Sequence, residues 1–199
     1  MKNIISSFKL DLPFWSKKIL REIPEQIPSD EEKMRLLFRF AKLNIDNNTG
    51  GPFSAGVFES ETGKIVSIGV NRVMPCNCSS AHAEIMALSL AQQKLGTYDL
   101  GGQGLPKHDL FVNWLPCTMC FGALIWSGVT RLVIAGHGHE MEEITGFDEG
   151  PRPVDWKNEL LKRNIDIVDN LLRDEAIEIF KFFKDNNQFV YNARQGLTK

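Results

Sequence analysis

Two short segments constrain the fold of this chain most, because together they carry side chains that can bind a metal ion. The first is His82-Ala83-Glu84, and the second is Pro116-Cys117-Thr118-Met119-Cys120. Proline is favoured at the start of a helix, and cysteines three positions apart lie on the same side of its first turn. The positive end of a helix also lowers the pKa of thiols, which favours the thiolates that zinc requires. We therefore predict one Zn2+ per chain, held by His82, Cys117 and Cys120.

Three protein ligands leave a fourth coordination position for water, which is typical of catalytic rather than structural zinc sites. Zinc lowers the pKa of such a water from about 16 to near 7, so that it loses a proton at neutral pH. Glu84 is close to a ligand without being needed as one. We predict that Glu84 is the catalytic residue that carries this proton.

Two other interpretations of the cysteines stay open. A structural zinc site would take a fourth ligand from the remaining cysteines and histidines, namely Cys76, Cys78, His108, His137 or His139. A redox-active pair would use Cys117 and Cys120 alone. Neither interpretation gives Glu84 a role.

Composition and charge argue against several classes of protein. The chain has 199 residues, of which 43% are apolar, so it has the length of one domain and enough apolar material for a core. Its formal net charge of -2 argues against a surface built to hold nucleic acid. No apolar run approaches the roughly 20 residues that span a membrane, and the first residues are too polar for a signal peptide. The spacing of Cys117 and Cys120 is typical of a metal or redox site in a reducing compartment, so we expect a cytoplasmic protein.

Hydrophobic periodicity predicts strands and helices that alternate along the chain. Ser29 and Glu32 have the spacing of a capping box, and apolar residues then recur at helical spacing up to Ile45. The further elements that we expect are strands at about 53–59, 64–71, 110–115, 131–136 and 165–168, and helices at 82–95, 118–127 and around 172–183.

This alternation predicts a three-layer α/β/α sandwich whose mixed central sheet has about five strands. We expect residues 1–28 to be an irregular N-terminal extension, residues 29–187 to be the catalytic domain, and residues 188–199 to be a tail. Residues 137–157 are predicted to form a loop, because glycines and prolines interrupt them.

The H-x-E and P-C-x-x-C motifs together resemble those of the cytidine deaminase-like zinc hydrolases. The order of helices and strands from about 30 to 168 resembles that superfamily as well. Four further segments resemble its bacterial guanine deaminases, namely Gly51-Pro52-Phe53, Asn71-Arg72-Val73, Gly146-Phe147-Asp148-Glu149-Gly150 and the tail around Tyr191. The resemblance implies that a homodimer hydrolyses guanine, a small purine base, to xanthine and ammonia.

The resemblance also implies roles for residues outside the metal motifs. Asn71 and the backbone N–H of Ala83 would bind the edge of the purine, and Glu149 would share proton transfer with Glu84. Three aromatic residues would stack on the ring or bound it, namely Phe53, Trp126 and Phe147. Tyr191 would close the pocket of the neighbouring subunit after exchange of the C-termini, unless the tail folds back on its own domain.

Two features bear on the choice of substrate. Residues 140–150 contain five acidic side chains and no basic one, which would repel a nucleotide phosphate or RNA at the pocket. Leu115 precedes Pro116 where the family usually has Glu, which leaves the polarity of the pocket open. An s-triazine, cytidine and the adenosine of tRNA stay open as substrates, as does a non-catalytic zinc-stapled interaction domain.

Overall fold

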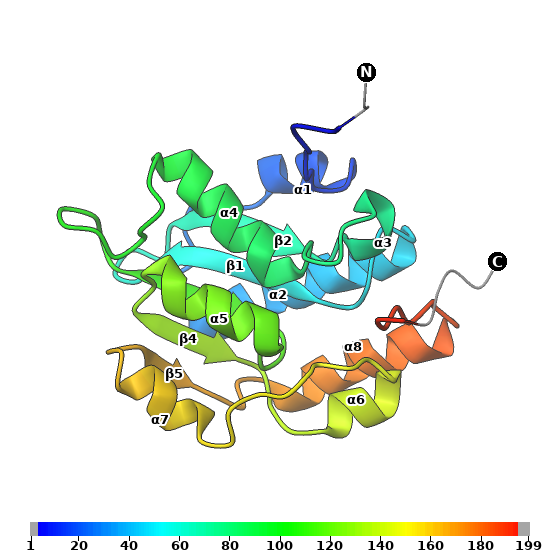
Figure 1. Cartoon of the computed structure of the whole chain (residues 1–199). Helices are drawn as coiled ribbons and strands as arrows, with labels where there is room; N and C mark the ends of the chain where they lie inside the picture. Colours follow the sequence, from blue (N-terminus) through cyan, green and yellow to red (C-terminus); the bar gives the residue numbers. More distant parts are fainter. Residues whose placement is uncertain (1–3, 195–199) are drawn as a thin grey trace.

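The protein forms three layers, in which one mixed β-sheet lies between two layers of helices (Figure 1). The computed structural model describes residues 4–194. The strands of the sheet follow the order β2-β1-β3-β4-β5. Their bounds are β1 (Ser54–Glu59), β2 (Ile65–Val70), β3 (His108–Val112), β4 (Arg131–Ile134) and β5 (Asp166–Val168). The predicted α/β/α sandwich with a mixed five-stranded sheet is thereby confirmed.

The direction of strand pairing changes in the middle of the sheet. β1 is antiparallel to both of its neighbours, β2 and β3, whereas β3, β4 and β5 run parallel. In register, Ala55 of β1 pairs with Gly69 of β2 on one side and with Val112 of β3 on the other. The start of β1 therefore lies beside the ends of β2 and β3, and the segments that continue from these three points meet at one end of the sheet.

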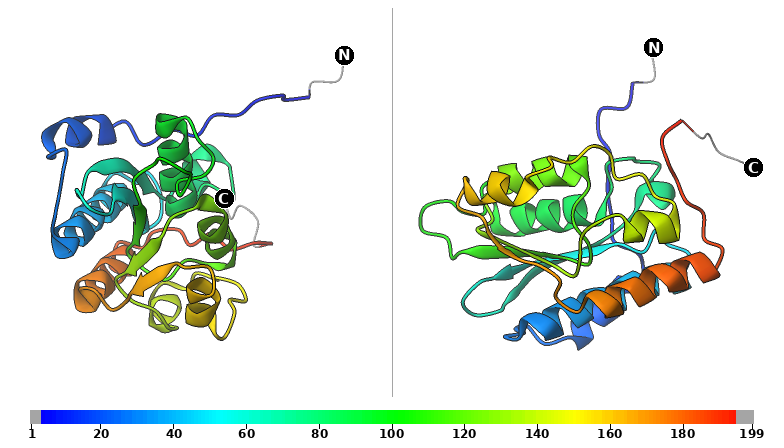
Figure 2. Two further views of the ribbon diagram at one scale, coloured as in Figure 1. Left: turned by 90° about the vertical axis from the view of Figure 1, so that its left-hand side faces the viewer. Right: turned by 90° about the horizontal axis from the view of Figure 1, so that it is seen from below.

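Pairs of helices cover the two faces of the sheet (Figure 2). The helices are α4 (Ala83–Leu95) and α5 (Thr118–Ser127) on one face, and α2 (Asp30–Asp46) and α8 (Arg173–Asp185) on the other. α4 contacts β1 and β2 and packs beside α5. α2 contacts the same two strands from the other face of the sheet and packs beside α8. Within residues 4–194, no helix combines the length and apolar character needed to cross a membrane.

The first helix of the sandwich, α2, begins where the capping-box spacing predicts. The side chain of Ser29 accepts a hydrogen bond from the backbone N–H of Glu32 at 3.3 Å. This bond pairs one of the N–H groups that every helix leaves free in its first turn. The apolar side of α2 is buried in the core, with Met34, Leu37 and Phe40 each 0% exposed. Burial of that side holds the helix on the sheet.

Short helices occupy parts of the chain for which the sequence predicted no helix. Within the described residues they are α1 (Ser16–Glu22), α3 (Val73–Cys76), α6 (Glu140–Thr145) and α7 (Trp156–Leu161). Helices of this length are unstable alone, so periodicity gives little sign of them. Tertiary packing stabilises α6 and α7 through Met141 and Leu160, which are both 0% exposed. The predictions of an irregular extension and of a loop across 137–157 were therefore wrong at these helices.

The end of the sheet where β1 begins is tied together by a buried amide. Asn113, just after β3, accepts a hydrogen bond from the Ser54 N–H at 3.0 Å through Oδ1. Its Nδ2 donates to the Pro52 carbonyl at 2.8 Å. Asn71 follows β2 directly, and Cys117 follows β3 after a short connection. This end of the sheet therefore brings residues of the sequence motifs together.

Candidate active site

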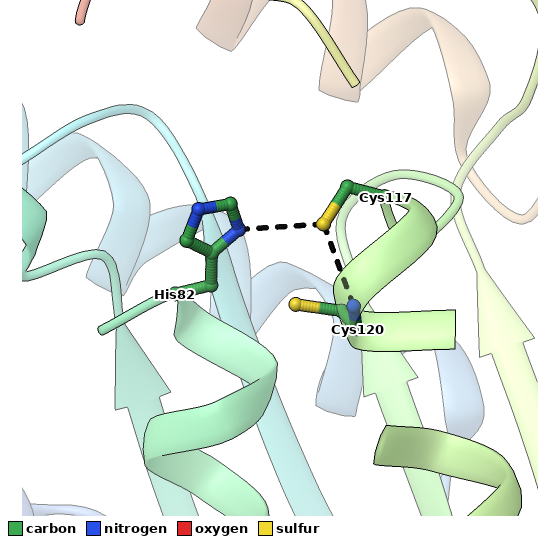
Figure 3. A group of neighbouring side chains, drawn as sticks. All are labelled: His82, Cys117 and Cys120. Carbon is green, nitrogen blue, oxygen red and sulfur yellow. Dashed lines mark hydrogen bonds between the residues drawn. The ribbon is translucent and has the colours of Figure 1, made fainter. Parts of the chain in front are cut away.

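The three predicted metal ligands lie together at the N-termini of α4 and α5 (Figure 3). His82 is the N-cap of α4 and Cys117 is the N-cap of α5. His82 Nδ1 lies 3.5 Å from Cys117 Sγ, and the ligand atoms of His82, Cys117 and Cys120 are all within 4.8 Å of one another. Among residues 4–194, none of the cysteines and histidines weighed as a fourth ligand belongs to this group. Its three members match the number that a catalytic zinc site uses.

The charges of this group fit a divalent cation. A hydrogen bond from Cys120 outweighs burial and, with one from His82, lowers the pKa of Cys117 to about 4. The pKa of Cys120 lies well above its usual value, because this thiol shares its proton with Cys117 and is buried. Burial lowers the pKa of His82, but the hydrogen bond to Cys117 and the negative charges of Glu84, Cys117 and Glu149 together outweigh it, and the net shift is upward. A cation in place of the shared proton would meet two thiolates and an imidazole, which is a ligand set of zinc.

Two buried carboxyl groups accompany the ligands. Glu84, in the first turn of α4, is 6% exposed, and Glu149 is 8% exposed. The Glu149 carbonyl accepts a hydrogen bond from the Thr118 N–H at 3.0 Å, which ties this segment to the first turn of α5. Burial, followed by the nearby Cys117 thiolate, raises the pKa of Glu84 to about 7 and that of Glu149 to about 8. Carboxyl groups with such pKa values can accept and donate protons near neutral pH.

The side-chain amide of Asn71 is held in one orientation. Its Oδ1 accepts hydrogen bonds from the backbone N–H groups of Gly51 and Val73, both at 3.3 Å. Because these two donors define the position of the oxygen, Nδ2 points the other way and donates to Tyr191 Oη. Asn71 is 0% exposed. The amide therefore presents a hydrogen-bond donor to the site.

Aromatic rings surround this donor. Phe147, which is 5% exposed, makes edge contacts with Phe53 at 5.2 Å and with Tyr191 at 5.0 Å between ring centroids. The ring of Tyr191 also lies 6.4 Å from that of His82. Phe53, Phe147 and Tyr191 thus belong to one aromatic group that extends to the metal ligands.

The tail reaches the site of its own chain. Asn192 accepts a hydrogen bond from the Asp148 N–H and donates to the Gly146 carbonyl, both at 2.9 Å. With Tyr191 bonded to Asn71, the tail contacts both Asn71 and the segment that carries Glu149. This is the arrangement of the alternative in which the tail folds back on its own domain. Residues 195–199 of the predicted tail lie outside the described residues.

Trp126 is not brought to this site. Its side chain is 85% exposed at the far end of α5, six residues beyond Cys120. Six residues of helix cover about 9 Å along the axis. The expectation that Trp126 stacks on a base in this site was therefore wrong. Ala83, in contrast, is fully buried at the first position of α4, where the helix supplies no acceptor for its N–H.

The acidic stretch 140–150 does not form a continuous acidic rim. Three of its carboxylates are on α6, where Glu140 pairs with Arg173 at 2.8 Å and Glu142 pairs with Arg152 at 3.6 Å. Helix formation turns Glu140 and Glu142 towards basic partners. The charge argument against phosphate substrates is correspondingly weaker than the sequence suggested.

Sequence reasoning missed Arg152, which lies two residues beyond that stretch. Its Nη1 donates to the Leu115 carbonyl at 3.2 Å, and its charge acts against the rise in the pKa of Glu149. Leu115 itself is 5% exposed and packs in the apolar core. The departure from the family's Glu thus places an apolar side chain in the core, and Arg152 binds the adjoining backbone.

A three-ligand metal site beside buried carboxyl groups, on two helix N-termini of an α/β/α sandwich, defines a metal-dependent hydrolase. Residues 27–136 match the model of the cytidine and deoxycytidylate deaminase zinc-binding region. The chain belongs to this family, and its site is a zinc site.

Several known proteins are similar to this chain. The solved structure of a guanine deaminase from Nitrosomonas europaea has a TM-score of 0.86 at 42% identity, covering 92% of this chain and 99% of that chain. A structure of the protein NE0047 in complex with 2,6-diaminopurine has a TM-score of 0.86 at 44% identity, covering 94% and 98%. A tRNA-specific adenosine deaminase from Buchnera aphidicola is 29% identical over 160 residues, which are 80% of this chain and 97% of that protein.

Proposed function

We propose that this protein is a zinc-dependent guanine deaminase, which converts guanine and water to xanthine and ammonia. The observation that carries the proposal is the buried donor amide of Asn71, grouped with two buried carboxyl groups and three zinc ligands. The similarity to the N. europaea guanine deaminase and to a protein that binds 2,6-diaminopurine supports a purine as the substrate.

Glu84 is the proton carrier for the attack of water. His82, Cys117 and Cys120 would hold zinc, which when bound lowers the pKa of water and so supplies hydroxide at neutral pH. Glu84 accepts the proton that the water loses and passes it to N3 of guanine. Protonation of N3 makes C2 more electrophilic, and the oxygen adds to C2.

Departure of the amino group needs a second proton transfer. The bond between C2 and the amino nitrogen breaks with its electrons on nitrogen, and nitrogen must first gain a proton to leave as ammonia. Glu149 is our candidate for this acid, because burial keeps its pKa high enough to hold a proton at neutral pH. Glu149 regains its proton from the hydroxyl group on C2, which thereby becomes the carbonyl of xanthine.

Asn71 and the aromatic group would bind the base. The Asn71 NH2 group donates to an acceptor on the purine edge, and the Ala83 N–H adds a second donor. Phe53 and Phe147 bound the ring, and Tyr191 covers it. In the structure Tyr191 Oη takes one N–H of Asn71, so a base either replaces this hydroxyl or accepts the other N–H of the same amide.

The assembly belongs to the proposal as well. A homodimer with exchanged C-termini would place Tyr191 in the site of the neighbouring subunit through the contacts that it makes here within one chain. A cytoplasmic location suits thiolate zinc ligands, because they must stay reduced to bind the metal. Small-molecule recognition needs neither a membrane nor a nucleic-acid partner.

The release of ammonia from a panel of substrates tests the proposed reaction. The panel contains guanine, guanosine, adenine, cytosine, cytidine, deoxycytidylate and ammeline, and inosine formation in tRNA is measured separately. We expect guanine to have the highest kcat/KM. A higher value for cytidine or deoxycytidylate would reject the purine assignment, and inosine formation without guanine turnover would favour a tRNA-editing enzyme.

A further inference from the structure

The backbone of Asn71 is held by another asparagine that lies outside the site. Asn44, near the end of α2, is 0% exposed. Its Nδ2 donates to the Asn71 carbonyl and to the Gly51 carbonyl, both at 2.9 Å. Gly51 is also one of the two residues whose N–H defines the position of Asn71 Oδ1. Asn44 therefore fixes both the backbone of Asn71 and a donor that orients its side chain.

The orientation of the Asn44 amide is set in turn by the loop after α2. Thr49 Oγ1 donates to Asn44 Oδ1 at 2.8 Å, so the Asn44 oxygen is occupied and its NH2 group faces the two carbonyls. Trp15 Nε1 donates to Thr49 Oγ1 at 3.0 Å. The Trp15 ring packs on Phe40 of α2, with ring centroids 5.6 Å apart. A line of direct contacts thus runs from Trp15 through Thr49 and Asn44 to Asn71.

A second connection joins the same parts of the chain. Arg72, which follows Asn71, donates to the Thr49 carbonyl at 2.6 Å and to the Asp11 carbonyl at 3.0 Å. Gly50 permits the close approach, since its φ is +151° and a Cβ there would lie 1.8 Å from the Asn71 carbonyl oxygen. The loop after α2 therefore packs directly on the backbone of Asn71, and the N-terminal segment holds that loop and the neighbouring Arg72.

We propose that Asn44 is a positioning residue for substrate recognition by Asn71, and that Thr49 and Trp15 set its orientation. The inference rests on the proposed function, in which the Asn71 NH2 group donates to the base. Without Asn44, the Asn71 carbonyl loses its partner and Gly51, which donates to Asn71 Oδ1, loses its support, so the direction of the Asn71 donor is less narrowly defined. Trp15 lies outside residues 27–136, which match the family model, so recognition of the base depends on the N-terminal segment as well.

The test uses variants that remove hydrogen bonds of this line and leave Asn44 itself in place. Asn44 is fully buried, so its replacement would also disturb packing. Thr49→Val and Trp15→Phe instead remove the hydroxyl group and the indole N–H, and each is made in the wild type and in Asn71→Ala. We expect each to raise the KM for guanine about three- to tenfold, the effect of one hydrogen bond, with kcat changed by less than about twofold.

The effect should vanish when Asn71 is absent. In the Asn71→Ala background, Thr49→Val and Trp15→Phe should leave KM unchanged, because they act through the Asn71 amide. Thr49→Ser keeps the hydroxyl group and should restore the wild-type KM. The matched control is Ser16→Ala, which removes the buried 2.7 Å hydrogen bond to the Pro13 carbonyl in the same N-terminal segment. This control should leave KM unchanged.

Failure of this inference can be told apart from failure of the proposed function. If Asn71→Ala raises KM but Thr49→Val does not, or raises it equally in both backgrounds, positioning through Asn44 is overturned. If Asn71→Ala itself leaves the KM for guanine unchanged, recognition by Asn71 is overturned and positioning with it.

Discussion

The two ends of the β-sheet differ in whether their buried ionisable side chains have partners of opposite charge. At the end where β3 and β4 begin, Arg131 lies 2.9 Å from Asp30 and 2.7 Å from Asp109. Lys33, whose side chain is 2% exposed, pairs with Asp30 at 3.1 Å. Burial opposes ionisation of Asp30, but the hydrogen bonds and positive charges of Arg131 and Lys33 together outweigh it and lower the pKa of Asp30.

At the opposite end, where the zinc ligands lie, buried carboxyl groups lack such partners. Within residues 4–194, neither Glu84 nor Glu149 takes part in an ion pair, and burial raises the pKa of both. Paired charges stay ionised and hold elements in place, whereas an unpaired buried carboxyl group has a pKa near neutral pH and can accept or donate a proton. The contrast separates the charges that build the fold from those that serve the reaction.

Of the changes considered, Glu84→Gln should lower the activity most. The amide has the shape of the carboxyl group but cannot accept a proton, so we expect kcat to fall by about a thousandfold. Zinc should stay at one ion per chain by elemental analysis, since Glu84 is not a ligand. Thermal stability should not fall, because no ion pair is lost. Activity within tenfold of the wild type would contradict the assigned role.

Glu149→Gln should lower kcat by about a hundredfold, with a smaller change in the affinity for guanine, as expected for a proton donor. The protonated form of Glu149 is present below its pKa, which is about 8 without a metal ion and lower with a cation bound nearby. Activity of the wild type should therefore decline as the pH rises through this pKa, and the decline should be absent in the variant. Asp148→Asn, at the exposed neighbouring position, serves as the control. An equal loss in both variants would assign the effect to the loop.

Truncation after Asn187 tests the tail that covers the reactive end. It removes the aromatic contact of Tyr191 with Phe147 and its hydrogen bond with Asn71. Such contacts together correspond to a loss of about ten- to a hundredfold in kcat/KM. The zinc content should stay at one ion per chain. Full activity would remove the role of the tail in closing the site.

Mixing the truncated chain with Glu84→Gln protein decides which site the tail closes. If C-termini are exchanged, a mixed dimer combines an intact Glu84 with an intact tail in one site, and activity recovers. Confirmed mixed dimers without recovery would mean that the tail acts within its own subunit, as it lies in the structure.

Asp30→Asn should affect stability alone, and is the mildest change for catalysis. It leaves Lys33 buried without its carboxylate, and we expect the free energy of unfolding to fall by about 2 kcal/mol at pH 7, with kcat unchanged. Because the folded pKa of Asp30 lies below its ordinary value, its contribution is present above about pH 4 and is lost as the pH falls through the folded pKa. Urea unfolding should show that the free energies of unfolding of the wild type and Asp30→Asn converge as the pH falls from about 7 to 3. A difference that stays constant with pH would exclude the charge of Asp30 as the source of the lost stability.

Local sequence signals predicted the metal end of the site but not the exact extent of its elements. The ligands His82, Cys117 and Cys120 lie in the N-cap or first turn of a helix, where neighbouring residues determine geometry. The third strand, in contrast, spans His108–Val112 rather than 110–115. Trp114 and Leu115 are as buried as strand residues, at 1% and 5% exposure, so hydrophobicity extends beyond the paired backbone. Strand ends depend on where partner strands stop, which no local pattern records.

The substrate end depends on contacts between distant segments. Asn71 and Tyr191 are 120 residues apart, and Asn44 and Asn71 are 27 apart. Helical spacing from Phe40 and Ala41 places Asn44 on the buried side of α2, but nothing in its neighbourhood predicts which carbonyl groups its amide meets. Trp126 shows the opposite error, because its place in a motif-bearing helix suggested a site residue although the helix carries it away from the ligands.

The motifs alone specified the metal chemistry, since a helix N-terminus and its ligands are made within a few consecutive residues. Tertiary structure decided which carboxyl groups lose contact with water, which way the Asn71 amide faces, and where the Tyr191 tail lies. A pKa and the orientation of an amide depend on solvent exclusion and on hydrogen-bond partners. In this fold those are supplied by α2, by the segment around Glu149 and by the tail, which meet only after the sheet has formed.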